Sequence, residues 1–111
     1  MFNISLNFKG ATILALERVI KTKQLGEVQM QYVYQLVQGE YNNQTAYGIK
    51  VERNEILQGA IIDTVSEEVR IISNVRDKVM KIIDKLSFHE VSPIHLIDII
   101  GEDVDKCVFD F

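Results

Sequence analysis

Three side chains with the chemistry of metal ligands lie close together near the C-terminus. His95, Asp98 and Glu102 are separated by three and four residues, so on a helix they project from one face. Imidazole and carboxylate groups are common ligands of divalent cations, and His89 or Glu90 could add a fourth ligand from the preceding loop. This spacing predicts a metal site at His95, Asp98 and Glu102. The alternative interpretation is a surface or packing cluster without a metal.

The same region offers groups for general acid and base chemistry but no complete catalytic set. A carboxylate such as Asp98 or Asp103 could orient His89 or His95. No nucleophile completes the arrangement, because acidic neighbours make Cys107 a poor one. The glycines do not form a phosphate-binding loop. We therefore assign no catalytic residue, expect no cofactor, and favour a non-enzymatic role over an enzymatic one.

A group of tyrosines suggests a contact surface. The four tyrosines lie on or beside two predicted strands, where glutamines alternate with them instead of Lys and Arg. This pattern favours contact with protein over binding of nucleic acid. The second face of the first strand is semi-apolar. The predicted interface of a homodimer, or with a protein partner, consists of Tyr32, Val33, Tyr34, Val37 and Tyr47.

The composition describes one small domain covering residues 1–111. The chain is 47% apolar and 25% charged, and its formal net charge is −4. Residues 1–56 sum to +1 and residues 57–111 to −5. The last fourteen residues carry five acidic side chains against one lysine, and residues 105–111 are predicted to be an acidic tail. No basic cluster of the kind that binds nucleic acid occurs. We assign no structure to residues 1–24 as a whole.

The cellular setting is predicted from what the sequence contains. The single cysteine fits a reducing compartment, and the start of the chain does not have the positive region of a signal peptide. The apolar stretches are too short for a membrane span. We expect a cytoplasmic protein with no membrane association.

Alternating apolar residues predict the strands. Residues 28–38 place Val28, Met30, Tyr32, Tyr34 and Leu36 on one face, and residues 46–53 form a second strand after an Asn-rich turn. Residues 17–22 could pair with the first strand. Asn54 and Gly59 bracket another break, and residues 60–72 are rich in β-branched residues.

The segment 65–86 allows two interpretations. Its apolar residues recur at spacings of three and four, which fits one long helix. We prefer a strand to residue 72 and a helix over 75–86, capped by Asn74 with Asp77. Ser92 and Pro93 begin a second helix over 93–104. Its apolar stripe is predicted at Ile94, Ile97, Ile100 and Val104, widened by Leu96 and Ile99.

This arrangement predicts an α+β fold. An antiparallel sheet of three to five strands is followed by two C-terminal helices packed on one face. The second helix is apolar around so much of its surface that a neighbouring helix or a second subunit must cover part of it. The function we predict is therefore a small interaction or regulatory module that acts as a homodimer. The alternative is a metal-binding protein or a metal-assisted enzyme.

Two segments carry a resemblance to a known family. Tyr47-Gly48-Ile49 and the segment from Ser92 to Asp98, which reads Ser-Pro-Ile-His-Leu-Ile-Asp, resemble motifs of a family of small uncharacterised proteins from Gram-positive bacteria. The resemblance covers residues 28–104. It implies an intracellular bacterial domain with strands first and helices last. It implies no activity.

Overall fold

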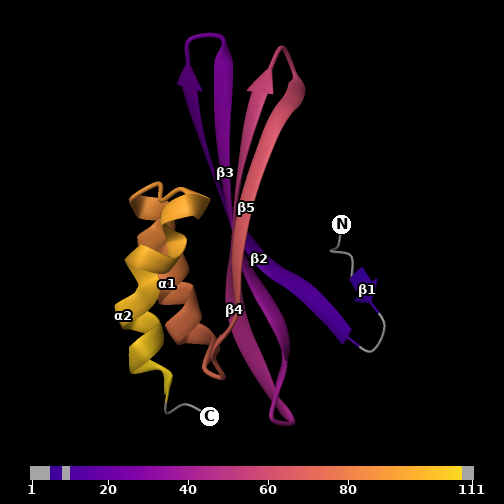
Figure 1. The fold of residues 1–111 in the computed structure, drawn as a ribbon, viewed down its shortest axis with the longest axis vertical. Helices are drawn as coiled ribbons and strands as arrows, with labels where there is room; N and C mark the ends of the chain where they lie inside the picture. The colour runs from indigo at the N-terminus through magenta and orange to yellow at the C-terminus, as the bar shows by residue number, and fades with distance from the viewer. Residues whose placement is uncertain (1–5, 9–10, 109–111) are drawn as a thin grey trace.

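The computed structural model describes residues 6–8 and 11–108, with side chains from residue 17 onward. One antiparallel sheet is followed by two helices that pack on one of its faces (Figure 1). The predicted α+β architecture is therefore confirmed, including the order of sheet before helices. Within the described ranges, no helix is long and apolar enough to cross a membrane.

Five strands lie in chain order across the sheet, each antiparallel to its neighbours. The predicted strands at 28–38 and 46–53 are both longer than expected, and the predicted pairing of residues 17–22 with the first strand is confirmed. Residues 1–5 and 9–10 of the unassigned N-terminal segment lie outside the described residues. The strands are β1 (Leu6–Phe8), β2 (Ala11–Leu25), β3 (Val28–Tyr41), β4 (Gln44–Leu57) and β5 (Ala60–Ser73).

Two-residue turns join the long strands. Asn42 and Asn43 have φ angles of 53° and 62°, and Gln58 and Gly59 have φ angles of 52° and 81°. Two successive residues with positive φ match the twist of a hairpin, and Asn and Gly adopt this backbone most readily. The predicted break at Asn54 is wrong. Asn54 lies inside β4, and the chain turns four residues later.

The segment 65–86 is a strand followed by a helix, and not one long helix. β5 continues to Ser73, and helix α1 (Arg76–Phe88) begins three residues later. The predicted capping pair is wrong, because Asn74 Nδ2 instead donates to Gln44 Oε1 at 3.0 Å. Ser73 Oγ accepts a hydrogen bond from the backbone N–H of Val75 at 2.9 Å. The side chain that contacts the helix start is therefore Ser73, one residue before the predicted Asn74.

The second predicted helix begins as a single 3₁₀ turn, η1 (Pro93–His95), and continues as α2 (Leu96–Lys106). α2 therefore includes the first two residues of the predicted acidic tail. Ser92 precedes η1 as predicted but makes no side-chain cap, and its carbonyl accepts the His95 N–H at 3.0 Å. The predicted apolar stripe is partly wrong. Leu96 and Ile100 are buried, whereas Ile94 and Ile97 are exposed.

The helices cover only one end of the sheet. In Figure 1 the turns at 26–27 and 58–59 extend well beyond the helical layer. We call the face under the helices the helix-side face, the opposite one the far face, and residues 22–31 and 54–64 the uncovered end. The core lies between the helices and the covered part of the sheet. Its buried residues are Tyr34, Leu36, Ile49, Val51, Ile72, Val79, Ile82, Ile83, Leu86, Val91, Leu96, Ile100 and Cys107.

A polar network crosses the far face of the uncovered end. Asn54 is only 4% exposed. Its Nδ2 donates to Gln31 Oε1 and to Glu52 Oε2, each at 3.0 Å, and its Oδ1 accepts from Thr64 Oγ1 at 2.7 Å. Gln31, Asn54 and Thr64 are direct neighbours in the register of β3, β4 and β5. Buried amides cost free energy unless they are hydrogen-bonded, and this network satisfies Asn54 from both sides.

Candidate functional site

The three predicted metal ligands lie at the start and on the outer surface of α2. His95 ends η1, Asp98 is in the first turn of α2, and Glu102 follows one turn later; all three are exposed. Among the described residues, no group of three or more His, Cys, Asp or Glu side chains is arranged to hold a metal ion. The metal site at His95, Asp98 and Glu102 therefore stays a prediction.

The two additional ligands considered from the preceding loop have other contacts. His89 follows α1, and its ring meets that of Phe88 edge to face at 5.1 Å between centroids. Glu90 Oε1 lies 3.5 Å from Lys23 Nζ on β2. Glu90 also has a φ of 51°, so the chain turns sharply between the helices at this residue. The loop therefore contributes a contact between the helical layer and the edge of the sheet.

The predicted interface residues do not form one exposed surface. Tyr32 and Tyr47 are half-buried and pack against the core. Tyr34 is buried on the helix-side face, and Val33 and Val37 are only 6% and 4% exposed on the far face. The predicted semi-apolar surface at Val33 and Val37 is therefore buried within a single chain. A charged substitution such as Val33→Lys would destabilise the monomer before it could report on an interface.

Tyr34 connects the sheet to the turn between the helices. Its hydroxyl donates to the carbonyl of Val91 at 2.9 Å in a buried position. Burial, together with the nearby Tyr32 and the negative charge of Glu90, raises the pKa of Tyr34 above its usual value. The phenol therefore stays protonated and holds the start of η1 against β3.

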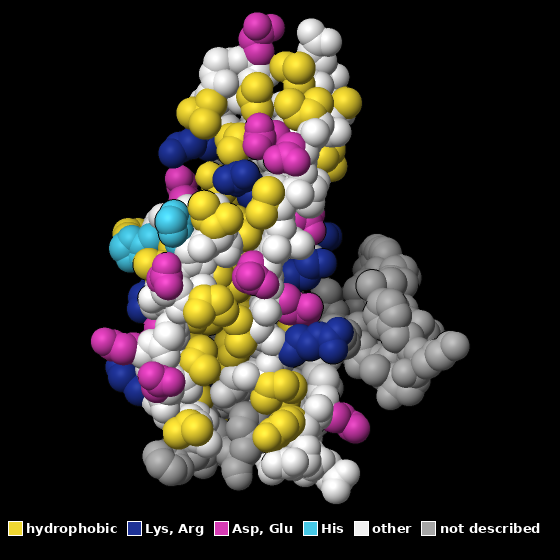
Figure 2. Space-filling view, viewed as in Figure 1, with side chains coloured by type: hydrophobic (Ala, Val, Ile, Leu, Met, Phe, Trp, Pro, Cys, Tyr) yellow, Lys and Arg dark blue, Asp and Glu magenta, His cyan; other side chains and the backbone are white. Residues whose placement is uncertain are grey.

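Three of the exposed apolar residues lie at the end of the helical layer that is over the middle of the sheet. Phe88 is 78% exposed, Ile94 67% and Ile97 55%. We call these three residues the apolar helix end. Figure 2 shows yellow hydrophobic side chains beside the two cyan histidines, which belong to this part of the chain. The sequence signal was the wide apolar surface of α2, but its stripe was assigned to the core by spacing alone.

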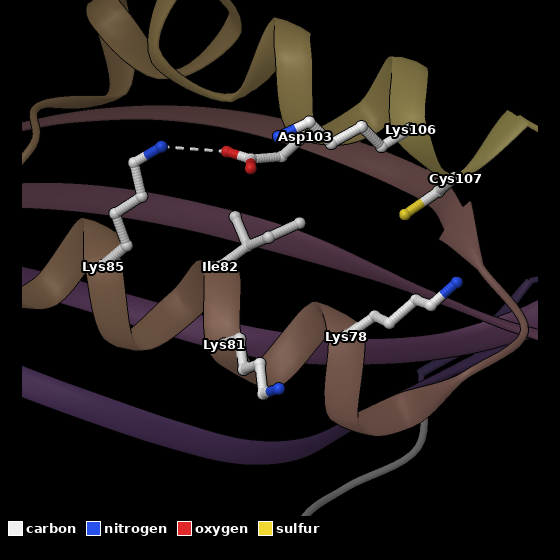
Figure 3. Close-up of a pocket in the computed structure, with 7 residues that line it drawn as sticks. All are labelled: Lys78, Lys81, Ile82, Lys85, Asp103, Lys106 and Cys107. Carbon is white, nitrogen blue, oxygen red and sulfur yellow. Dashed lines mark hydrogen bonds and ion pairs between the residues drawn. The ribbon is translucent and has the colours of Figure 1, made fainter.

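A cavity of about 270 Å³ lies between α1 and α2, at the end opposite to Phe88. In Figure 3 Ile82 points into the space between the helices, and Lys85 reaches across to Asp103. The Lys85 Nζ to Asp103 Oδ2 distance is 2.9 Å, which ties the helices together. Lysine ammonium groups favour an anion over a cation here. The lining residues are Lys78, Lys81, Ile82, Lys85, Asp103, Lys106 and Cys107.

This cavity was not predicted from the sequence. Lys78, Lys81 and Lys85 recur at spacings of three and four along α1, which places them on neighbouring turns. That spacing was the available signal, but it describes a solvated helix face equally well. The contribution of α2 depends on the antiparallel packing of the two helices. Cys107, which follows α2, is buried beside this cavity.

The fold and its surfaces define a class of small α+β proteins, in which an antiparallel meander is covered at one end by two helices. The chain matches a family of unknown function, DUF6514, over residues 15–106, and it belongs to that family. The predicted membership in a family without an assigned activity is thereby confirmed. No curated protein and no solved structure matches the chain.

Proposed function

We propose that this protein is a non-enzymatic interaction module that works as a homodimer. The observation that carries this proposal is the apolar helix end, where Phe88, Ile94 and Ile97 each expose more than half of their surface. Contiguous apolar patches on small monomers are often sites of contact with another protein. We further propose a cytoplasmic setting in a Gram-positive bacterium, in keeping with the single, buried Cys107.

The geometry of α2 favours a second copy as the occupant. Leu96 and Ile100 face the core, while Ile97 and Ile99 face outward, so the helix is apolar on two sides. A Cβ added at Gly101 would meet nothing within 4 Å, which leaves room for a second helix to approach the α2 backbone. A two-fold axis would bring the same surface of both copies together, as in most small homo-oligomers.

The surroundings of the apolar helix end suit an interface of modest size. His89, His95 and Asp98 are exposed around it and would form a polar rim. Three large side chains at the centre are fewer than a permanent dimer usually buries. We therefore expect a reversible dimer that forms in the micromolar range, rather than an obligate one.

Sedimentation velocity tests this proposal. At high micromolar concentration the wild type should sediment as a particle of twice the 12.7 kDa chain mass. Near 1 M salt, roughly a 3 Å Debye length, charged contacts between copies are screened, and the double variant Ile94→Asp/Ile97→Asp should sediment as a monomer. Ile20→Asp is the matched control, because Ile20 is 49% exposed on the far face of β2 and should not affect the dimer. A wild type that stays monomeric, or a double variant that still dimerises, would contradict the homodimer.

Native mass spectrometry distinguishes the metal-binding alternative in the same sample. Protein that was never exposed to chelator should give a dimer with no added mass. An added mass of one divalent ion per chain, lost in His95→Ala, would instead support binding at His95, Asp98 and Glu102. In that case zinc or cobalt should also raise the melting temperature of the wild type but not of His95→Ala.

A further inference from the structure

Both edges of the sheet are open along straight stretches. Within the described residues, β5 pairs only with β4, and β2 pairs only with β3 between Glu17 and Leu25. Residues 63–69 keep one register with β4, and residues 17–25 keep one register with β3. Edge strands present unpaired backbone N–H and C=O groups to any other strand. Each edge could therefore accept a further strand over about seven residues.

The two edges carry opposite charge. β2 has three basic residues against Glu17, namely Arg18, Lys21 and Lys23. β5 has three acidic residues against Arg70, namely Asp63, Glu67 and Glu68. Charged residues on an edge strand commonly prevent pairing between copies. Here the two edges have opposite signs, so the acidic edge of one copy attracts the basic edge of the next.

The direction of the strands permits this contact. Three antiparallel steps separate β2 from β5, so these two strands run in opposite directions. A copy placed beside the first without inversion brings its β2 antiparallel to β5. When Asp63 faces Lys23 in this pairing, Glu68 faces Arg18, because five residues separate the members on each strand. We propose that copies of this chain join edge to edge in this register, β5 of one copy pairing with β2 of the next.

The two charge pairs would lie on opposite faces of the joined sheet. Lys23, Met30, Glu55 and Asp63 form one row across the strands on the helix-side face. Arg18, Gln35, Lys50 and Glu68 form a row on the far face. In the proposed register each row continues straight into the next copy. One contact on each face therefore resists both sliding and rotation of the strands.

The ion pairs that Lys23 and Glu68 form within one chain do not prevent the proposed contact between copies. Lys23 lies 3.5 Å from Glu90, and Glu68 lies 3.6 Å from Arg70. Both are surface ion pairs, which are weak and rearrange readily. The described pairing of β1 with β2 involves residues 11–13 and so lies outside the proposed contact.

The width of the helical layer is similar to the distance between neighbouring copies along the joined sheet. Four strands at about 4.8 Å advance each copy by about 19 Å. Two helices packed side by side at about 8–10 Å occupy a similar width. Strand twist of about 20–25° per step also rotates each copy relative to the last, so the helical layers would follow one another around the joined sheet. This inference goes beyond the proposed homodimer, because it uses a different surface and produces a head-to-tail assembly.

A charge-exchange experiment tests the proposal independently of the homodimer. All proteins carry Ile94→Asp/Ile97→Asp, so that the apolar helix end contributes nothing. One variant adds Arg18→Glu/Lys23→Glu, and the other adds Asp63→Lys/Glu68→Lys. The parent should form concentration-dependent assemblies near 0.01 M salt, roughly a 30 Å Debye length, and lose them near 1 M salt, roughly 3 Å.

Each charge variant alone should sediment as a monomer, because like charges meet at the edge. An equal mixture of the two should assemble again, because both exchanged edges then find opposite charges. Lys81→Glu/Asp84→Lys on α1 is the control and should behave as the parent. Circular dichroism checks that all variants are folded. A parent that stays monomeric at low salt, or a mixture that does not assemble, would overturn the proposal.

Cysteine cross-linking tests the register itself. Thr22 and Thr64 would face each other across the joined edge on the far face. Mixed Thr22→Cys and Thr64→Cys proteins should form a disulfide-linked pair on mild oxidation, since directly opposite strand residues are close enough for this bond. Gln24→Cys should not link to Thr64→Cys. Equal linkage in both mixtures would contradict the register.

Discussion

The two ends of the sheet use the same strands but are stabilised differently. At the covered end, Leu36 and Ile49 are fully buried under α1 and α2. At the uncovered end, Leu25 is 53% exposed and Ile61 59%, and the buried contact is the polar network around Asn54. Apolar residues occur in the strands of both ends, but those of the uncovered end have no helix over them. Coverage by the helices therefore decides where apolar burial stabilises the helix-side face of the sheet.

The largest expected effect separates the two ends directly. Leu36→Ala should lower the free energy of unfolding by about 2–5 kcal/mol, because it leaves a cavity in a fully packed core. Leu25→Ala removes the same atoms from an exposed site and should change stability by about 0.5 kcal/mol or less. Urea denaturation measures both. Similar losses in the two variants would contradict the division into covered and uncovered ends.

A second prediction concerns the close approach of β4 and β5 at the covered end. A Cβ at Gly48 would lie 2.2 Å from the backbone oxygens of Val69 and Arg70, where the strand register shifts. Backbone atoms cannot move aside as a side chain would. Gly48→Ala should therefore destabilise the protein by about 3 kcal/mol or more.

Gly39→Ala is the matched control, because a Cβ there meets nothing within 4 Å. Gly39 lies in β3, where Ala costs no more than Gly. Thermal unfolding of the two variants gives the comparison. A Gly48→Ala protein as stable as Gly39→Ala would show that the two strands can separate here at little cost.

Some features of the two ends of the sheet could be predicted from the sequence, and others could not. Period-two alternation correctly placed Tyr34 and Leu36 on one face, and turn chemistry located the Asn42–Asn43 hairpin. Alternation is a local property, so it could not show that the helices end above the middle of the sheet. Asn54 was assigned to a turn because Asn favours turns, but its partners come from β3 and β5.

The helices show the same limit. α1 has one apolar stripe, and its four buried aliphatic side chains recur at the spacings of three and four that predicted a helix. α2 has apolar residues on two sides, so spacing alone could not decide that Leu96 faces the core and Ile97 the solvent. The orientation of α2 also decides which of its residues form the candidate surfaces. Both the apolar helix end and the lysine-lined cavity depend on how the two helices pack.

A third prediction tests whether the polar network stabilises the uncovered end. Asn54→Ala removes the group that links Gln31 to Thr64 and should cost about 1–3 kcal/mol. Thr64→Val removes only one bond and should cost less. Hydrogen exchange should show that the amides of residues 22–31 and 54–64 lose protection in Asn54→Ala, while those of the core keep it. Uniform loss across the sheet would mean that both ends unfold together.

The smallest expected effect concerns the bond at the boundary between the two ends. Tyr34→Phe removes the hydrogen bond to the Val91 carbonyl and should cost about 1 kcal/mol near neutral pH. Because folding raises the pKa of Tyr34, the stabilisation is complete below the unfolded value of about 10 and decreases as pH rises above it. The difference in stability between wild type and Tyr34→Phe should therefore shrink in alkaline solution.

Tyr41→Phe is the control for this measurement, since Tyr41 is exposed beside the turn between β3 and β4. Its effect on stability is compared with that of Tyr34→Phe over the same pH range. If the Tyr34→Phe difference did not change with pH, ionisation of Tyr34 would not be coupled to folding. In that case the hydroxyl would not hold η1 against the sheet, and the helical layer would be anchored by its apolar contacts alone.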